Sequence, residues 1–174
     1  DSLLIDYFGA KNNVYSMEAI RVPLIGAVAR IFEPGCKFDL VLTLVSDQGT
    51  YKSTFLKKLG KEWFSDTFMT VQGKEAFEQV QGAWIIEMAE LSGLRKAEVE
   101  AVKHFITKQE DVFRPAYART SEVFKRQCVF FGTTNVKDFL RDPSGNRRFL
   151  PVDVVVDRVK KQVTTDLTES EVNQ

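Results

Sequence analysis

The stretch that most constrains the fold is residues 40–54, where an apolar run leads into a small-residue loop that ends in Lys52-Ser53-Thr54. The run has the composition of a buried β-strand, and the residues after the loop have helical spacing. A strand, a loop and a helix in this order form the unit in which a lysine binds the phosphates of a nucleotide and a hydroxyl binds magnesium. The helix N-terminus adds a favourable partial positive charge. These residues therefore predict an α/β domain with a phosphate-binding loop.

The loop departs from the usual pattern G-x-x-x-x-G-K-[ST] at both glycines. Ser46 takes the first position and Tyr51 the second, although Gly49 lies inside the loop. If φ is positive at Tyr51, the side chain adds strain of about 1 kcal/mol, and its ring either crowds the phosphates or points away. The alternative is a buried strand, a polar turn and an ordinary helix. We expect a nucleotide, ATP with magnesium, to contact Ser46, Asp47, Gln48, Gly49, Thr50, Tyr51, Lys52, Ser53 and Thr54.

Length and composition limit the classes of protein to which this chain can belong. The 174 residues, 44% of them hydrophobic, are enough for one core, so a single domain is the default. Formal net charge is zero, so contacts with DNA must come from local patches. Two cysteines without metal-ligand spacing predict a reduced protein of the cytoplasm. The longest apolar stretch, residues 19–32, is interrupted by arginines and a proline and predicts no membrane helix. A start at Asp1 without methionine indicates a piece of something longer.

Strand-like and helix-like segments alternate along the chain, which predicts a three-layer α/β domain with a mainly parallel sheet, and the loop makes this a P-loop NTPase. A mixed polar and aromatic segment without helical period predicts a β-hairpin inserted into this core. We expect a helical lead-in over 1–35, a P-loop ATPase core over 36–155 and, over 156–174, a polar tail that is either frayed or a truncated linker. The expected helices are 16–33, with Ser16 as N-cap, 73–80 and 94–107, and the expected strands are 38–45, a short one near 62–66, 84–88, 127–135 and the hairpin 112–126.

Polar side chains follow two further strands. A phosphate site with magnesium needs carboxylates at a neighbouring strand end, and Glu87 and Glu90 have this position. We assign Glu87 to magnesium, together with Ser53, and Glu90 to water activation, with the two roles open to exchange; the alternative is a surface glutamate pair. Asn135, at the end of the third strand, is expected to orient the attacking water or to cap the next helix.

Two groups of basic residues predict contacts beyond the loop. Arg147 or Arg148 is expected to reach a nucleotide in a neighbouring subunit, while the other pairs with a carboxylate; two solvated arginines are the alternative. In the hairpin, basic residues alternate with aromatic ones, a pattern that suits single-stranded DNA. A charged, solvated face with an apolar underside is the alternative there. The expected DNA contacts are Arg114, Arg119, Lys125 and Arg126.

Ordered motifs over residues 3–155 resemble the virulence-associated protein E family. They are residues 48–49 (QG), 52–56 (KSTFL), 61–64 (KEWF), 82–91 (GAWIIEMAEL), 95–98 (RKAE), 131–135 (FGTTN) and 145–149 (GNRRF). The resemblance implies a P-loop ATPase related to superfamily 3 helicases of phages and plasmids, often beside a primase domain, that assembles as a ring and moves along DNA. It carries the phosphate, magnesium, acidic and sensor roles onto Lys52, Ser53, Glu87, Glu90 and Asn135, and the finger role onto Arg147 or Arg148. It also implies an AAA+-like core and a place in the bacterial host cytoplasm. Tyr51 departs from the family's usual glycine.

Three hypotheses follow. The leading one is the magnesium-dependent ATPase motor of a mobile-element replication helicase or primase-helicase. The second, motivated by Tyr51 and Ser46, is a degenerate P-loop domain that binds DNA or a protein and hydrolyses ATP poorly. The third, a P-loop kinase, fits the hairpin and the paired arginines less well. Phosphate release stimulated by DNA would indicate the motor, and a phosphorylated acceptor would indicate the kinase. Neither product would indicate the binding module.

Overall fold

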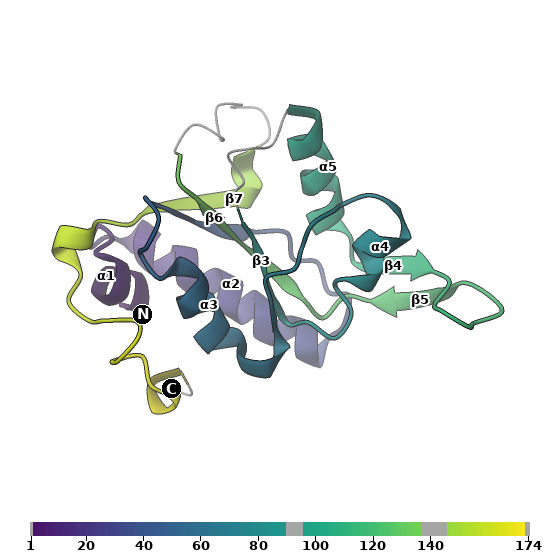
Figure 1. Ribbon diagram of the computed structural model, residues 1–174, viewed down its shortest axis with the longest axis horizontal. Coiled ribbons are helices and arrows are strands. Elements are labelled where there is room, and N and C mark those ends of the chain that lie inside the picture. The colour runs from purple at the N-terminus through teal and green to yellow at the C-terminus, as the bar shows by residue number, and fades with distance from the viewer. Residues whose placement is uncertain (1, 90–95, 137–145, 173–174) are drawn as a thin grey trace.

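The computed structural model describes residues 2–89, 96–136 and 146–172, in which helices and parallel strands alternate (Figure 1). The elements in chain order are α1 (Leu3–Phe8), α2 (Val14–Phe32), β1 (Val41–Val45), α3 (Lys52–Gly60), η1 (Lys61–Trp63), β2 (Phe64–Ser65), α4 (Gly73–Glu78), β3 (Ile85–Met88), α5 (Lys96–Thr107), β4 (Glu110–Phe113), β5 (Glu122–Lys125), β6 (Val129–Thr134), η4 (Asn146–Arg148), β7 (Phe149–Asp153), η5 (Val156–Arg158) and α6 (Glu169–Val172).

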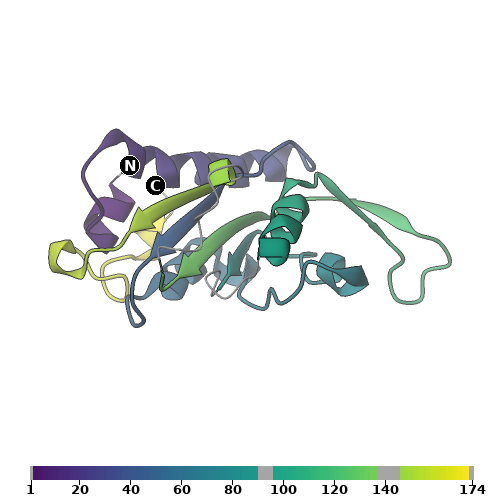
Figure 2. The same ribbon diagram turned by 90° about the horizontal axis from the view of Figure 1, so that it is seen from above.

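Within the described ranges the main sheet has five strands in the order β2-β3-β6-β1-β7, and every neighbouring pair is parallel. Strand β6 lies between β1 and β3, with Leu42 opposite Phe131 on one side and Ile86 opposite Phe130 on the other. Figure 2 shows the strands side by side with their carboxyl ends pointing the same way. The expected α/β fold with a parallel sheet is confirmed.

Helices cover both faces of the sheet, as its apolar strands require. In Figure 1, α2 and α3 lie below the sheet and α5 lies above it. Alternate residues of the strands point to the two sides: Leu42 and Phe131 belong to a core that also contains α1, α2 and α3. Val41 and Phe130 belong to a second core with α4 and α5. The result is the three-layer arrangement of a P-loop-like domain.

Helix α2 begins earlier than expected. Asn13, not Ser16, is its N-cap: the Asn13 side chain accepts a hydrogen bond from the Ser16 backbone N–H at 2.9 Å. Pro23 lies inside the helix. Gly26 has a packing role, because a Cβ there would come within 2.4 Å of the Phe38 ring. The helix therefore lies close to the segment that leads into β1.

The hairpin of β4 and β5 is antiparallel, separate from the main sheet, and projects from it at the right of Figure 1. It leaves the core after α5 and returns just before β6, so it starts from the amino edge of the sheet. At its base Arg126 is only 2% exposed, and its guanidinium donates to both carboxylate oxygens of Asp111 at 2.7 Å. The prediction that Arg126 contacts DNA is wrong, because this side chain is buried in an internal ion pair.

The prediction of a frayed tail is also wrong for residues 156–172. Val163 and Leu167 are buried in the core that contains α1 and α3. Lys58 of α3 donates hydrogen bonds to the backbone oxygens of Thr164 and Leu167, each at 2.9 Å. Tyr7 of α1 donates to the Glu171 carboxylate. Two apolar anchors in a polar segment thus hold the tail on the domain. No helix in the described part of the chain is long and apolar enough to cross a membrane.

Candidate nucleotide-binding site

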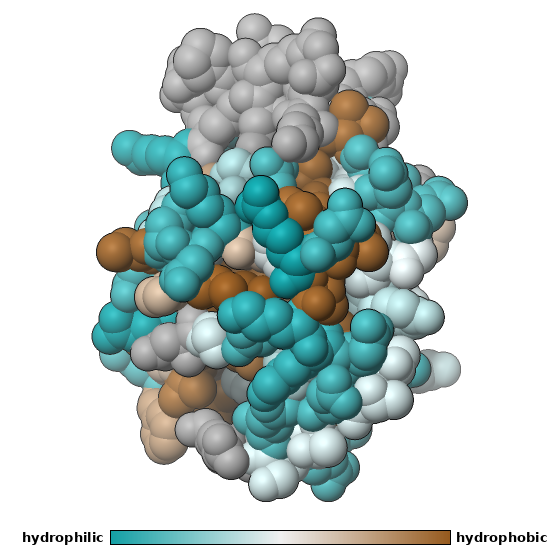
Figure 3. Space-filling model, turned by 90° about the vertical axis from the view of Figure 1, so that its left-hand side faces the viewer, coloured by the Kyte–Doolittle hydropathy of each residue, from teal (hydrophilic) through white to brown (hydrophobic). Residues whose placement is uncertain are grey.

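A pocket of about 440 Å³ lies at the carboxyl edge of the sheet, where β1, β3 and β6 end. The loop after β1 forms one wall, and residues at the ends of the two neighbouring strands form the other. The side of the molecule toward which the strands point is largely hydrophilic, with an apolar band across it (Figure 3). The lining consists of Gln48, Gly49, Thr50, Tyr51, Lys52, Ser53, Thr54, Glu87, Ala89, Thr133, Thr134 and Asn135.

Lys52 is the first residue of α3, and its ammonium group lies inside the loop. It donates to the backbone oxygens of Ser46 and Asp47 and to the Ser46 hydroxyl, each at 2.9 Å, and to the Thr50 hydroxyl at 3.3 Å. Desolvation lowers the pKa of Lys52, with Asp47 and Glu87 opposing the shift through their charges. The lysine is thus held at the centre of the loop, as a phosphate ligand would require.

Two residues of the loop have left-handed backbone conformations. Gly49 has φ 83°, which glycine adopts readily, and Tyr51 has φ 58°, which costs a residue with a Cβ of the order of 1 kcal/mol. The strain expected at Tyr51 required a positive φ, and the structure has one. The Tyr51 side chain is 51% exposed, so the ring is not enclosed by the loop. Turns of this kind direct successive N–H groups toward an anion.

Ser53 and Glu87 are in contact across the pocket. The Ser53 hydroxyl donates to Glu87 Oε1 at 2.8 Å, although β6 separates β3 from β1 in the sheet. Glu87 is only 2% exposed and accepts a second hydrogen bond, from the Thr133 hydroxyl at 2.6 Å. A hydroxyl and a carboxylate are oxygen ligands of the kind that Mg²⁺ prefers, with water and phosphate completing its shell. These side chains fit that ion.

The described ranges contain no group of three or more His, Cys, Asp and Glu side chains that could hold a metal by themselves. Asn135 follows β6 and lines the same pocket, so the structure brings Lys52, Ser53, Glu87 and Asn135 together. Glu90 lies outside the described residues.

The two arginines lie elsewhere. They form η4 immediately before β7, whose first residue is opposite the first residue of β1, so they are at the amino edge of the sheet. A five-residue strand, about 16 Å long, separates them from the level of the loop. Arg148 Nε contacts Asp39 Oδ2 at 3.2 Å and the Thr107 hydroxyl at 3.1 Å, whereas Arg147 is exposed. Arg148 is therefore the arginine that pairs with a carboxylate.

Three of the four predicted DNA-contact residues are exposed on the hairpin: Arg114, Arg119 and Lys125. Tyr117, near the tip, is fully exposed with φ 67°. Phe113 stacks on Phe124 with ring centroids 4.5 Å apart. The hairpin therefore carries cations and an aromatic ring outward and has an aromatic underside.

Sequence reasoning missed three partners of these residues. Thr133 donates to Glu87, Asp39 pairs with Arg148, and Asp111 pairs with Arg126. A signal for Thr133 was present, because two threonines end an otherwise apolar strand. Nothing in the local pattern distinguishes the two aspartates from solvent-exposed ones.

The parallel sheet, the loop after its β1 strand and the Lys52–Ser53–Glu87 arrangement define a P-loop-type α/β domain. The family model described as the virulence-associated protein E-like domain matches residues 1–174, and the chain belongs to this family.

Solved structures give the same fold. The apo structure of the NrS-1 C-terminal region (305–718) is 17% identical, with a TM-score of 0.59 over 99% of this chain and 47% of that one. An A form apo structure of the same region has a TM-score of 0.61 at 17% identity, over 98% of this chain and 40% of that one. The chain thus spans less than half the length of these structures. No curated protein matches it significantly.

Proposed function

We propose that this chain is the ATP-binding and hydrolysing motor domain of a mobile-element replication helicase or primase-helicase that acts on DNA. The observation that carries the proposal is the meeting of Lys52, Ser53 and Glu87 in one pocket at the carboxyl edge of a parallel sheet. Open α/β sheets bind ligands at this edge. Membership of the virulence-associated protein E-like family supports a replication-related role on DNA.

In this proposal each side chain has a defined task. Lys52 binds the β- and γ-phosphates and neutralises charge that develops during transfer. Ser53 and Glu87 would hold Mg²⁺, which would supply positive charge that stabilises the phosphate oxygens. Thr133 orients the Glu87 carboxylate through its 2.6 Å hydrogen bond. Asn135 orients the attacking water, and Glu90 is proposed to polarise it.

The position of the arginines supports action between subunits. Arg147 is exposed at the amino edge of the sheet, whereas the loop is at the carboxyl edge. It can therefore meet a nucleotide only in a neighbouring copy, as in a ring of identical chains. Arg148 fixes the base of this segment through Asp39.

Calorimetry with Mg-ATP tests the nucleotide site in a single chain. We expect binding by the native protein and loss of at least about tenfold in affinity in Lys52→Ala, because the lysine makes charge-assisted hydrogen bonds. Lys57→Ala is the matched control, since Lys57 is an exposed lysine of the same helix. Equal affinities of Lys52→Ala and Lys57→Ala would overturn the proposal.

A binding module with little hydrolysis is the second candidate, and one observation favours it. Four oxygens of its own loop already lie within hydrogen-bond distance of the Lys52 ammonium group and compete with phosphate oxygens for its three N–H donors, and Tyr51 strains that loop. Phosphate release, measured with and without DNA, distinguishes the two. ATP binding without any turnover would favour the module.

The DNA contact has its own test. Arg114→Ala and Arg119→Ala should weaken binding of single-stranded DNA and reduce the salt dependence of the binding constant by somewhat less than one unit of slope each. Arg21→Ala, on the exposed side of α2, is the control. An unchanged salt slope in both hairpin variants would remove the hairpin from the DNA site.

A further inference from the structure

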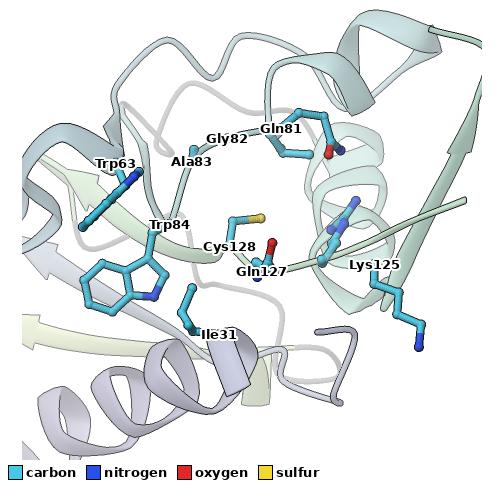
Figure 4. Close-up of a pocket in the computed structure, with 11 residues that line it drawn as sticks. Ile31, Trp63, Gln81, Gly82, Ala83, Trp84, Lys125, Gln127 and Cys128 are labelled. Atoms are coloured by element: carbon cyan, nitrogen blue, oxygen red, sulfur yellow. The ribbon is translucent and has the colours of Figure 1, made fainter. Parts of the chain in front are cut away.

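A second pocket, of about 460 Å³, lies at the amino edge of the sheet, opposite the candidate nucleotide site. It is formed where η1 ends, where the segment before β3 passes, and where β5 runs into β6. Figure 4 shows the rings of Trp63 and Trp84 at one end, Lys125 at the other, and Cys128 and Gln127 between them. These are both of the tryptophans in the chain.

The aromatic end of this pocket offers ring faces rather than hydrogen bonds. The Trp84 indole N–H donates to the Ala27 backbone oxygen at 2.9 Å, which fixes this ring against α2. Trp63 is 52% exposed, an unusual state for the largest apolar side chain. Ile31 closes the floor on the α2 side (Figure 4). A flat, apolar group entering here would contact aromatic surface without displacing an internal hydrogen bond.

The other end is polar and carries positive charge. Gln81 donates to the Phe77 backbone oxygen at 3.1 Å, which holds this side chain at the rim. Gln127 and Lys125 are exposed, and the buried charge of Arg126 is balanced by Asp111. The lining contains no Asp or Glu. The rim therefore combines amide groups, which both donate and accept, with the ammonium group of Lys125.

Lys125 also links this pocket to a second hollow. An open groove of about 770 Å³ at the base of the hairpin is lined by Lys125 together with Lys37 and Lys108, and by two glutamates, Glu33 and Glu110. From there β5 leads to the exposed cations of the hairpin. Exposed cations thus lie both at the base of the hairpin, beside the aromatic pocket, and toward its tip, with glutamates between them.

We propose that the pocket between Trp63 and Lys125 takes a base of a single-stranded nucleic acid whose phosphates contact Lys125 and the hairpin. A base supplies a flat ring for Trp63, hydrogen-bonding edges for Gln81 and Gln127, and a phosphate for Lys125. An apolar protein segment would use the rings but would leave the lysine and the amides without partners. The inference rests on the proposed action on DNA and adds a site for the bases.

Tryptophan fluorescence reports on this pocket directly, because both tryptophans line it. The full chain is titrated with a short oligo(dT), and with an abasic strand of the same length, while anisotropy of a labelled copy follows total binding. We expect oligo(dT) to quench the fluorescence and the abasic strand to leave it unchanged. Trp63→Ala should weaken oligo(dT) binding by about 5- to 150-fold, and Trp63→Phe should restore most of it.

Phe32→Ala is the matched control, since Phe32 is an exposed aromatic residue next to Ile31 that does not line the pocket. Absence of quenching by oligo(dT), or equal binding by Trp63→Ala and Phe32→Ala, overturns the proposal. If binding then still depends on Arg114 and Arg119, the proposed action on DNA stands without this site. If Arg114→Ala and Arg119→Ala also leave DNA binding unchanged, the proposed action on DNA is wrong as well. Calorimetry of Lys52→Ala tests the ATP site independently of both results. Quenching by an apolar peptide but not by oligo(dT) identifies a protein-docking pocket instead.

Discussion

Tyr51 has a left-handed backbone conformation that is unfavourable for a residue with a Cβ atom. It is the N-cap of α3 and has φ 58° and ψ 26°, a region that costs a residue with a Cβ about 1–2 kcal/mol. Its ring is 51% exposed, so little apolar burial offsets this strain. Strain that packing does not explain is most often found at functional sites.

Replacing Tyr51 by glycine should therefore stabilise the domain. Relief of the left-handed strain exceeds the extra entropy that glycine gives the unfolded chain, and we expect a net gain of about 0.5–1 kcal/mol in the free energy of unfolding. Urea denaturation measures it. Tyr51→Ala is the control, because alanine removes the ring but keeps the Cβ. Equal gains in both variants would show that the ring, not the backbone, is the source of strain.

At Gly49, adding a side chain should destabilise the domain. Its φ is 83°, and no atom lies within 4 Å of the place where a Cβ would be. Gly49→Ala should lower the free energy of unfolding by about 1 kcal/mol through backbone strain alone. The same urea titration tests it, and an unchanged midpoint would mean that the loop changes its conformation at little cost.

At the scale of elements, a buried ion pair closes the base of the hairpin, and its arginine packs on α5 of the core. Arg126 donates to both oxygens of Asp111, and its guanidinium lies 4.2 Å from the centroid of the Phe105 ring of α5. Asp111 is in β4 and Arg126 directly follows β5, so the pair joins the two ends of the hairpin. The orientation of the hairpin relative to the sheet depends on this contact.

Asp111→Asn should be strongly destabilising, by about 3–5 kcal/mol, because it leaves the Arg126 charge buried without its carboxylate. Denaturant unfolding gives the value. The exposed pair Arg21–Glu18 provides the contrast: Glu18→Gln should change stability by less than about 1 kcal/mol. Recovery in the double variant Asp111→Leu/Arg126→Met would identify the unpaired charge as the cause, and a loss as large as in the single variant would exclude it.

At the scale of the whole molecule, the last described segment completes the core. Val163 and Leu167 pack with residues of α1 and α3, and the two ends of the chain lie on the same side of the molecule in Figures 1 and 2. Lys160 and Lys161 donate backbone hydrogen bonds to the Asp6 oxygen of α1 at 2.9 and 3.0 Å. The domain therefore extends beyond the last strand of its sheet.

Leu167→Ala should lower the free energy of unfolding by about 2–5 kcal/mol, since the side chain is only 2% exposed. Ser170→Ala, at an exposed position of α6, should change it by no more than about 0.5 kcal/mol. Thermal or urea unfolding compares the two. Equal stability of both variants would restore the expectation of a frayed tail.

The contact between tail and α1 should also weaken in acid. Hydrogen bonds from Lys161, and then from Tyr7, lower the pKa of Glu171 below its ordinary value of 4.5. A carboxylate with a lowered folded-state pKa stabilises the fold above that ordinary value, and its contribution is lost as the pH falls through the folded-state pKa. The stability difference between the native protein and Glu171→Gln should thus be present at neutral pH, begin to fall near pH 4.5 and vanish once the pH is below the folded-state pKa. Melting temperatures across that range test it, and a pH-independent difference would contradict it.

The sequence by itself determined the elements whose signals are local. The apolar run into Lys52-Ser53, the alternation of strands and helices, and the hairpin over 112–126 are all found where their patterns predict them. The reason is that periodicity and turn chemistry act over a few residues. The sequence also predicts that Lys52, Glu87 and Asn135 lie at one edge of the sheet, because parallel strands all end at the same side.

Only the tertiary structure decided which distant side chains meet. Arg126 has the same composition signal as Arg114 and Arg119, yet it is buried, because Asp111 lies opposite it across the base of the hairpin. Thr133 contacts Glu87 because β6 lies between β1 and β3, and the tail packs because α1 leaves space for Leu167. The pocket between Trp63 and Lys125 likewise joins segments about sixty residues apart. Such contacts depend on strand order and packing, which no local pattern encodes.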